Sequence, residues 1–531
     1  MPEKKSLDAK LPWIVLIAAI FLGFWFNLGG VPLFDLDEGA FSEATREMLS
    51  SGNYLTTYLD GALRFDKPIL IYWLQALSVK SFGLNEFALR LPSALAATLW
   101  VALLYRFAKR FYGHNTALIA AFMMATALQI SIIAKAAIAD SLLNLLIAAS
   151  MFLIYSYSRE QKRSTLNAIF ILIGLGTLTK GPVAILIPLV VSLLFLGSKR
   201  EWRLWLRMVF DPTGILLFLL VTAPWYLLEY LDQGEAFIDG FFLKHNLNRF
   251  NSSFEGHSGS LFYYIPVVLA GLLPYTTLLL RSLRDLRSCF TDDLLRFLAI
   301  WFLFVFLFFS FSGTKLPHYV IYGYTPLFIL MALAIPKIKS EKMLLLPPLI
   351  LFVILLFLPI IASLALPWVK HPFTRLMLES APSEFGWEWY LYFLLIITVT
   401  IRLMKTERVS RISKLVTIGL LTALTVSWQV IPAYAAIAQK PIKEAALIAR
   451  KNHYDVHLWK FNMPSFILYR EAIVRRDAPK VGEIVLTRKN HLEGYGSYTT
   501  LYEKHGIILA KITSLQRKES AAVSPQKQTK D

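Results

Sequence analysis

The chain has 531 residues, of which 56% are hydrophobic and 17% are charged, and its formal net charge is +18. The mean hydropathy of +0.53 excludes an ordinary soluble globular protein and indicates a polytopic membrane protein. A nucleic-acid-binding function is disfavoured, because the basic residues lie between apolar segments and no soluble basic domain carries them.

Apolar runs long enough to cross a hydrocarbon core of about 30 Å recur along the chain. They lie near residues 12–31, 91–108, 116–137, 140–157, 167–180, 182–198, 213–231, 261–280, 294–312, 317–335, 343–367, 387–404 and 415–437. The first run is too long for a cleavable signal peptide, so we expect it to remain as the first span. About thirteen spans, an odd number, would place the two ends of the chain on opposite sides of the membrane.

Lysine and arginine near span ends are retained on the cytoplasmic side, so their positions test the order of the spans. With the N-terminus inside, every second connection is basic: Arg106/Lys109/Arg110, Arg159/Lys162/Arg163, Lys199/Arg200/Arg203/Arg207, Arg281/Arg284/Arg287, Lys337/Lys339/Lys342 and Arg402/Lys405/Arg408/Arg411. The alternation predicts a cytoplasmic N-terminus and an extracytoplasmic C-terminus.

The outer connections are longer, above all the first, at residues 32–90. After residue 437 the composition turns polar, and alternating stretches at 483–487 and 507–510 indicate strands. We therefore predict a mainly α fold with a transmembrane domain at 1–437, a small extracytoplasmic α/β domain at 438–515, and a disordered tail at 516–531 that is rich in Lys, Gln and Ser.

The segment Asp35-Leu36-Asp37-Glu38-Gly39 follows the first apolar run and places carboxylates at a membrane surface. An acidic residue beside a bilayer is costly unless it faces water, a cation or a polar cavity, so this segment is a candidate site.

Directly after the acidic segment, Phe41, Ala44 and Met48 recur at helical spacing, with Gly52 as a stop signal. This pattern predicts a helix that lies flat on the membrane. Asp37 would precede that helix, so it could be the N-cap, a catalytic group, or both.

A second carboxylate, Asp140, lies at the outer mouth of a predicted span, where burial without a partner would be expensive. We interpret it as a site residue. The alternative is that it pairs with Lys135 or Lys180.

Several motifs of the sequence are similar to those of a known protein family. They are Leu36-Asp37-Glu38-Gly39-Ala40-Phe41-Ser42-Glu43, Arg46-Glu47-Met48-Leu49, Phe65-Asp66-Lys67-Pro68, Phe82-Gly83-x-x-Glu86-Phe87-x-x-Arg90, Leu178-Thr179-Lys180-Gly181, His245-Asn246-x-x-Arg249-Phe250 and Gly313-x-Lys315-Leu316-Pro317-x-Tyr319. These stretches closely resemble the bacterial aminoarabinose (4-amino-4-deoxy-L-arabinose) lipid A transferase family. That family belongs to the GT-C glycosyltransferases, alongside the protein O-mannosyltransferases. The likeness covers about residues 10–437 and fades beyond them.

The resemblance implies an enzyme of the bacterial inner membrane that moves one sugar from a polyprenyl-phosphate carrier to an outer-leaflet acceptor, lipid A, with inversion at the anomeric carbon. Asp37 matches the position of the family's catalytic carboxylate. With a hydroxyl acceptor it would act as general base. A phosphate acceptor, with a second pKa of about 6, needs little deprotonation, and Asp37 would then orient it or bind a sugar amine.

A departing lipid phosphate develops negative charge, so cations must be aimed at it in a site of low dielectric constant. Lys67, Arg249 and Lys315 fall at predicted outer ends within the family-like motifs, and we assign them to the donor phosphate. A single cation at a span end is more often a snorkelling residue. Tyr319 could hydrogen-bond the same phosphate or be an interfacial aromatic residue.

Glu38, Asp66 and His245 are predicted to support the site, although solvation at a helix start would account for Glu38 and its neighbour Asp35. Asp66 and His245 could hold a divalent metal, but two ligands fall short of a metal site. The sequence therefore assigns no metal site, and the need for a divalent metal stays open. The sequence contains no glycine-rich phosphate loop, consistent with a lipid-linked donor rather than a nucleotide.

Two other functions remain open. A protein O-mannosyltransferase-like enzyme would use the same chemistry on a protein or another glycan. A transporter or flippase would also have many spans, but transporters usually carry internal repeats and charges near the midplane. In this chain no repeat is evident and the charges gather toward one side.

Overall fold

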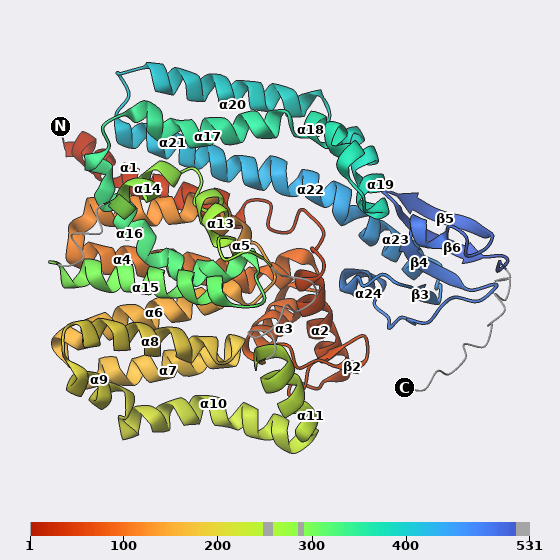
Figure 1. The fold of residues 1–531 in the computed structure, drawn as a ribbon, viewed down its shortest axis with the longest axis horizontal. Coiled ribbons are helices and arrows are strands. Elements are labelled where there is room, and N and C mark those ends of the chain that lie inside the picture. The colour runs from red at the N-terminus through yellow and green to blue at the C-terminus, as the bar shows by residue number, and fades with distance from the viewer. Residues whose placement is uncertain (1, 248–258, 285–290, 517–531) are drawn as a thin grey trace, which may run out of the picture.

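The computed structural model describes residues 2–247, 259–284 and 291–516. Long helices run side by side, and a small sheet lies beyond one end of them (Figure 1). Within the described ranges seven helices are long and apolar enough to cross a membrane, and nine are if each of two bent helix pairs counts as one span.

The helices follow the apolar runs of the sequence. They are α1 (Pro2–Ile20), α4 (Glu86–Thr126), α5 (Leu128–Ala134), α6 (Asp140–Glu160), α7 (Arg163–Lys180), α8 (Val183–Ser198), α10 (Pro212–Gln233), α13 (Tyr264–Gly271), α14 (Thr276–Arg284), α15 (Asp293–Phe311), α16 (Tyr324–Ala334), α17 (Glu341–Leu356), α18 (Leu358–Ala365), α20 (Trp387–Lys405), α21 (Arg411–Thr425) and α22 (Ile431–Ala438). Shorter elements between them are α9 (Trp202–Val209), α11 (Glu235–Phe237) and α19 (Pro372–Ser380).

Several predicted spans are bent or interrupted. The backbone leaves the helical region at Gly113, which divides α4 into two helices with a φ of 81°. The span predicted at 261–280 consists of α13 and α14, which meet at a bend of 119°, and that predicted at 343–367 bends by 60° between α17 and α18. Pro274 stands in the first of these breaks, where its missing N–H favours the end of a helix.

The basic connections gather at one end of the helices. Ion pairs and hydrogen bonds join them to one another and to nearby helix ends: Arg110 with Glu160, Arg163 with Asp211, Lys199 with Asp293, and Arg281 with the Lys337 carbonyl. Because α6 runs from Asp140 to Glu160, the Asp140 end lies at the opposite side. There the first connection and the sheet are found (Figure 1).

The predicted helix of the first connection is present as α2 (Asp37–Ser51), and it ends at Gly52, whose φ of 71° is left-handed. The strand pair β1 (Tyr58–Leu59) and β2 (Ala62–Leu63) and the helix α3 (Leu70–Phe82) follow it. Both faces of α2 are buried, including the charged residues Glu43 and Glu47. The prediction that this helix lies flat on the membrane is therefore wrong, because protein encloses it.

The polar C-terminal part follows α22, and its first helix is α23 (Lys440–Lys451). It continues through β3 (Val456–Leu458), α24 (Pro464–Arg470), β4 (Ile484–Arg488), α25 (Lys489–Leu492), β5 (Tyr498–Lys504) and β6 (Ile507–Ile512). The strand order is β3-β4-β6-β5, with β3 and β4 parallel and the other pairs antiparallel. Both alternating stretches of the sequence are strands. The predicted disordered tail lies outside the described residues from position 517 on.

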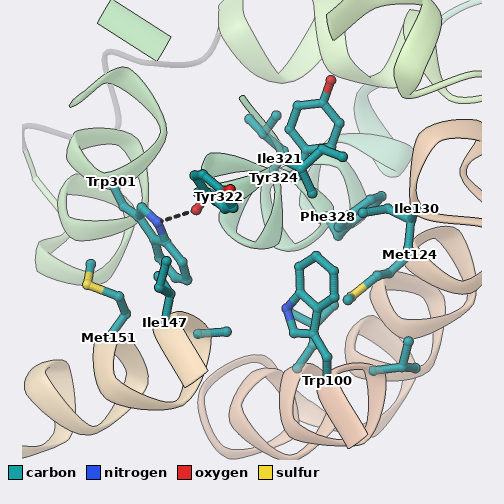
Figure 2. Close-up of a cluster of buried hydrophobic side chains, with 14 of the residues drawn as sticks. Trp100, Met124, Ile130, Ile147, Met151, Trp301, Ile321, Tyr322, Tyr324 and Phe328 are labelled. Atoms are coloured by element: carbon teal, nitrogen blue, oxygen red, sulfur yellow. Dashed lines mark hydrogen bonds between the residues drawn. The ribbon is translucent and has the colours of Figure 1, made fainter. Parts of the chain in front are cut away.

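The main core lies between α4, α6, α15 and α16 (Figure 2). Trp301 Nε1 donates to the Tyr322 carbonyl at 2.8 Å, and Trp100 Nε1 donates to Thr325 Oγ1 at 3.0 Å. Both buried indoles are thus satisfied, as large amphipathic aromatic residues require. These bonds fix the short 3-10 helix Pro317–Gly323 and the start of α16, and so hold Tyr322 in place beside the first turn of α6.

Candidate active site

A small polar cavity lies at the end of the helices opposite the basic connections. It is lined by Asp37, Phe41, Asp66, Lys67, Ile138, Asp140, Lys180, Leu316, His318 and Tyr319. Five of these residues, from four separate stretches of the chain, are site residues proposed from the sequence: Asp37, Asp66, Lys67, Asp140 and Tyr319. The structure therefore brings together most of the predicted side chains whose positions it describes.

Asp37 is the first residue of α2 and is exposed. The N-cap of that helix is Leu36, with no side-chain capping bond, so the alternative that Asp37 is the N-cap is wrong. Among the residues that the structure describes, none donates a hydrogen bond to the Asp37 carboxylate. This carboxylate is thus free to accept a proton or a hydrogen bond from a molecule in the cavity.

Asp140 is buried, and one of its carboxylate oxygens, Oδ1, has two partners. Its Oδ1 lies 2.7 Å from Lys180 Nζ and accepts a hydrogen bond of 2.8 Å from the Tyr322 hydroxyl. The two interpretations of Asp140 hold together, since it lines the cavity and is also an ion-pair partner. Its partner is Lys180, whereas Lys135 Nζ donates to the Leu22 carbonyl and to Ser427.

Lys67 reaches the cavity beside Asp66. Its Nζ lies 2.7 Å from Asp66 Oδ1, and Arg64 Nη2 lies 3.0 Å from Asp66 Oδ2. Burial opposes the charge of Arg64, but Tyr72 and Asp66 raise the pKa of its guanidinium above the ordinary value. Asp66 therefore lies between two cations and holds the Lys67 ammonium at the cavity wall.

Glu38 faces away from solvent, and the interpretation that it is merely solvated at a helix start is wrong. It is 4% exposed and forms a two-point ion pair with Arg90, which is 2% exposed. The Phe34 and Ala137 N–H groups also donate to its carboxylate, at 2.8 Å and 2.6 Å. These bonds fasten the start of α2 to the start of α4 and to the segment before α6.

Asp35, the other flanking acid, is not simply solvated either. Its carboxylate accepts hydrogen bonds from the N–H and the hydroxyl of Ser465 in α24. The acidic segment of the first connection is therefore held on both sides of Asp37, by Glu38 toward the helices and by Asp35 toward the C-terminal part.

The remaining predicted site residues are placed as follows. The ring of Tyr319 lies 5.7 Å from Lys180 Nζ, a cation–π distance. Lys315 is buried and its Nζ donates to the Ser312 carbonyl at 2.7 Å, so it does not line the cavity. Arg249 lies outside the described residues, as does the side chain of His245.

Four residues at or next to the cavity were not expected there from the sequence: Lys180, His318, Tyr322 and Arg64. Lys180 and His318 lie inside motifs that carry the resemblance, and Arg64 directly precedes another. Motif membership was therefore a usable signal for Lys180 and His318, and proximity to a motif for Arg64. Tyr322 has no such signal, because its contact with Asp140 depends on how the 3-10 helix Pro317–Gly323 packs against α6.

No group of three or more His, Cys, Asp or Glu side chains lies close enough to hold a metal ion in the part of the chain that the structure describes. The cavity instead combines three carboxylates with two lysines, and Arg64 lies directly behind. Asp140 and Asp66 are each paired with a cation, and Asp37 is the free acid. This arrangement offers one base together with positive charge for an anionic group.

The chain is similar in sequence to several known proteins. The family model of the dolichyl-phosphate-mannose-protein mannosyltransferases matches residues 66–227. The undecaprenyl phosphate-alpha-4-amino-4-deoxy-L-arabinose arabinosyl transferase of Erwinia tasmaniensis is 32% identical over 311 residues, which are 56% of this chain and 55% of that protein. An uncharacterised protein of Aquifex aeolicus is 32% identical over 317 residues, which are 60% of this chain and 71% of that one. The chain thus spans little more than half the length of the Erwinia transferase.

Two solved structures have a similar architecture. The crystal structure of ArnT from Cupriavidus metallidurans bound to undecaprenyl phosphate aligns with a TM-score of 0.79 at 20% identity, over 94% of this chain and 98% of that one. The oligosaccharyltransferase of Archaeoglobus fulgidus aligns with a TM-score of 0.51 at 12% identity, over 96% and 74%. The chain therefore has the GT-C type of fold, that of a multi-pass membrane protein.

Proposed function

We propose that the chain is a member of the aminoarabinose lipid A transferase-like family, to which its sequence and fold are similar, and that it is an inverting glycosyltransferase. It moves a single sugar from an undecaprenyl-phosphate carrier to an acceptor on the outer leaflet. In its most specific form the reaction is the transfer of aminoarabinose to lipid A.

One observation carries this proposal: the free Asp37 carboxylate and the Lys67 and Lys180 ammonium groups line the same cavity. The acceptor oxygen attacks the anomeric carbon, a new C1–O bond forms, and the bond to the carrier phosphate breaks. Asp37 takes the acceptor proton when the acceptor is a hydroxyl group. The cations balance the charge that develops on the departing phosphate, in a site where such interactions are strong.

Asp140 has a different task in this proposal. Its carboxylate already accepts from Lys180 and Tyr322, so it is a poor candidate for the base. It holds the Lys180 ammonium in place at the cavity wall, and Asp66 does the same for Lys67.

The proposal includes a membrane topology. About thirteen spans at 1–437 cross the bacterial inner membrane, the N-terminus is cytoplasmic, and a small α/β domain at 438–515 lies in the periplasm. Two findings support this orientation: the basic connections contact one another at one end of the helices, and the cavity lies at the other.

Purified full-length protein, given undecaprenyl-phosphate-linked aminoarabinose and lipid A in detergent, tests the reaction. We expect mass spectrometry to show lipid A heavier by one sugar residue and free undecaprenyl phosphate released in equal amount. Detergent solution has no gradient, so a transporter or flippase would leave the donor intact. Intact donor in this assay, together with donor crossing the bilayer in proteoliposomes, would contradict the proposal.

A protein O-mannosyltransferase-like activity is the second candidate, favoured by the family model matched at residues 66–227. The same cavity chemistry would serve it, because only the acceptor and the sugar differ. Polyprenyl-phosphate mannose with a Ser/Thr-rich peptide, supplied to the same preparation, separates the two. Glycosylated peptide without modified lipid A would favour this second activity.

A further inference from the structure

The segment just before Asp37 is held by residues more than 400 positions away. Ser465, at the start of α24, donates from its backbone N–H to Asp35 Oδ1 at 2.9 Å, and its hydroxyl bonds Asp35 Oδ2. Ser465 is buried, so water does not compete for these bonds.

Gly39 shows how closely the two elements approach. A Cβ at this position would lie 2.7 Å from the Ser465 nitrogen and would collide with the Asp35 carboxylate. The first turn of α2 therefore rests directly on the contact between Asp35 and Ser465. Any shift of α24 must be transmitted to that turn, because no space separates them.

Two further side chains hold the backbone of the same segment. The Gln439 amide, oriented to satisfy both groups, donates to the Leu33 carbonyl and accepts from the Asp35 N–H, each at 3.2 Å. The Tyr469 hydroxyl accepts from the Leu33 N–H at 2.8 Å. Gln439 is 5% exposed. Residues 33–35 are therefore anchored through both backbone and side chain to the polar C-terminal part.

On the other side of Asp37, Glu38 is bound to Arg90 and to the Ala137 N–H. Asp37 thus lies between an anchor in the helices and an anchor in the C-terminal part. Its own carboxylate accepts no hydrogen bond from the described residues, so the flanking contacts fix the backbone that carries it. A catalytic group must be held to within a fraction of an ångström of its productive geometry.

We propose that Ser465 and Gln439 are positioning residues for the reaction, which hold residues 33–35 so that Asp37 faces the cavity. They touch neither Lys67 nor Lys180, and they act only through the Asp35 segment. This inference rests on the proposed function. The C-terminal part of the chain, where the family resemblance fades, would thus influence the rate of the chemical step through the Asp35 segment.

The test compares Ser465→Ala and Asp35→Asn with a matched control, Asp60→Asn. Asp60 also belongs to the first connection, and it also accepts from a backbone N–H and a side chain of the C-terminal part, Val474 and Arg476. We expect kcat to fall about tenfold or more in the first two variants, because small misplacements of a catalytic group are costly. KM values should change less than twofold, and Ser465→Thr, which keeps the hydroxyl, should restore kcat. Asp60→Asn should stay within twofold of wild type.

Hydrogen exchange of the full-length chain provides a readout that does not depend on activity. Ser465→Ala should speed exchange of the amides at residues 33–41, and Asp60→Asn should not. Unchanged exchange, unchanged kcat, or an equal loss of kcat in Asp60→Asn would each overturn the inference. A wild-type chain that transfers no sugar would instead overturn the proposed function, while the exchange rates still decide whether Ser465 holds this segment.

Discussion

Lys180 Nζ lies 2.7 Å from Asp140 Oδ1, so an ion pair joins the last residue of α7 to the first residue of α6 at the wall of the cavity. The Asp140 side chain is 4% exposed and that of Lys180 10%. Removing one partner of such a pair is costly, because the other charge remains buried without water or a counter-ion.

Lys180→Met should therefore lower the free energy of unfolding by about 3–5 kcal/mol. Asp140→Asn combined with Lys180→Met should recover most of that loss, because no charge is left unpaired. Thermal unfolding in detergent measures both. Lys199→Met is the control, since its partners Glu201 and Asp293 are at least one-third exposed and the expected loss is below about 1 kcal/mol. A similar loss of unfolding free energy in Lys180→Met and Lys199→Met would contradict the burial of the ion pair between Asp140 and Lys180.

Asp37→Asn should reduce sugar transfer by about 10²–10⁴-fold and leave the thermal unfolding temperature near that of wild type, because the described structure gives this carboxylate no hydrogen bond to lose. Glu38→Gln, one residue away, should lower the thermal unfolding temperature, since it weakens the buried ion pair between Glu38 and Arg90. Initial rates with a lipid-linked donor and unfolding curves of both variants check this. Unfolded Asp37→Asn protein would favour a structural role.

Lys67→Ala should raise KM for the lipid-linked donor, because it removes a cation from the cavity that would hold the phosphate. It should also weaken inhibition by free undecaprenyl phosphate. Lys315→Ala offers the comparison, since that ammonium is bound to the Ser312 carbonyl away from the cavity lining. We expect Lys315→Ala to affect stability more than donor KM. Equal effects of the two variants on donor KM would show that Lys315 also reaches the phosphate.

Stability should depend on pH through Asp35. Burial raises the pKa of its carboxyl to about 7, although the hydrogen bonds from Ser465 act in the opposite direction. Between the ordinary value of 3.8 and about 7, the folded chain keeps a proton that the unfolded chain has released. Its contribution to stability is therefore complete below pH 3.8 and is lost as pH rises toward 7.

Asp35→Asn does not titrate, so its unfolding temperature should fall less than that of wild type between pH 4 and 7. Unfolding temperatures of the two proteins, measured in one detergent across this range, check the sign. Parallel curves would show that Asp35 has an ordinary pKa in the folded chain.

Much of the molecule could be predicted from local sequence signals. Apolar runs indicated the helices, because a hydrophobic segment of this length needs no distant partner to become helical in a membrane. The pattern of Phe41, Ala44 and Met48 with Gly52 predicted α2 and its end, since helical periodicity and a left-handed glycine stop are local features. The first-connection motifs also pointed to Asp37 and Lys67, which line one cavity.

The sequence by itself determined that this is a helical membrane protein with acidic and basic side chains at one end, because hydropathy, turn signals and motif spacing lie within short stretches. Only the tertiary structure decided which charges meet. Lys180 rather than Lys135 pairs with Asp140, Glu38 is buried against Arg90, and Ser465 holds Asp35 across 430 positions. The physical reason is that such pairings depend on how distant helices pack, and packing is set by the whole core rather than by any one segment.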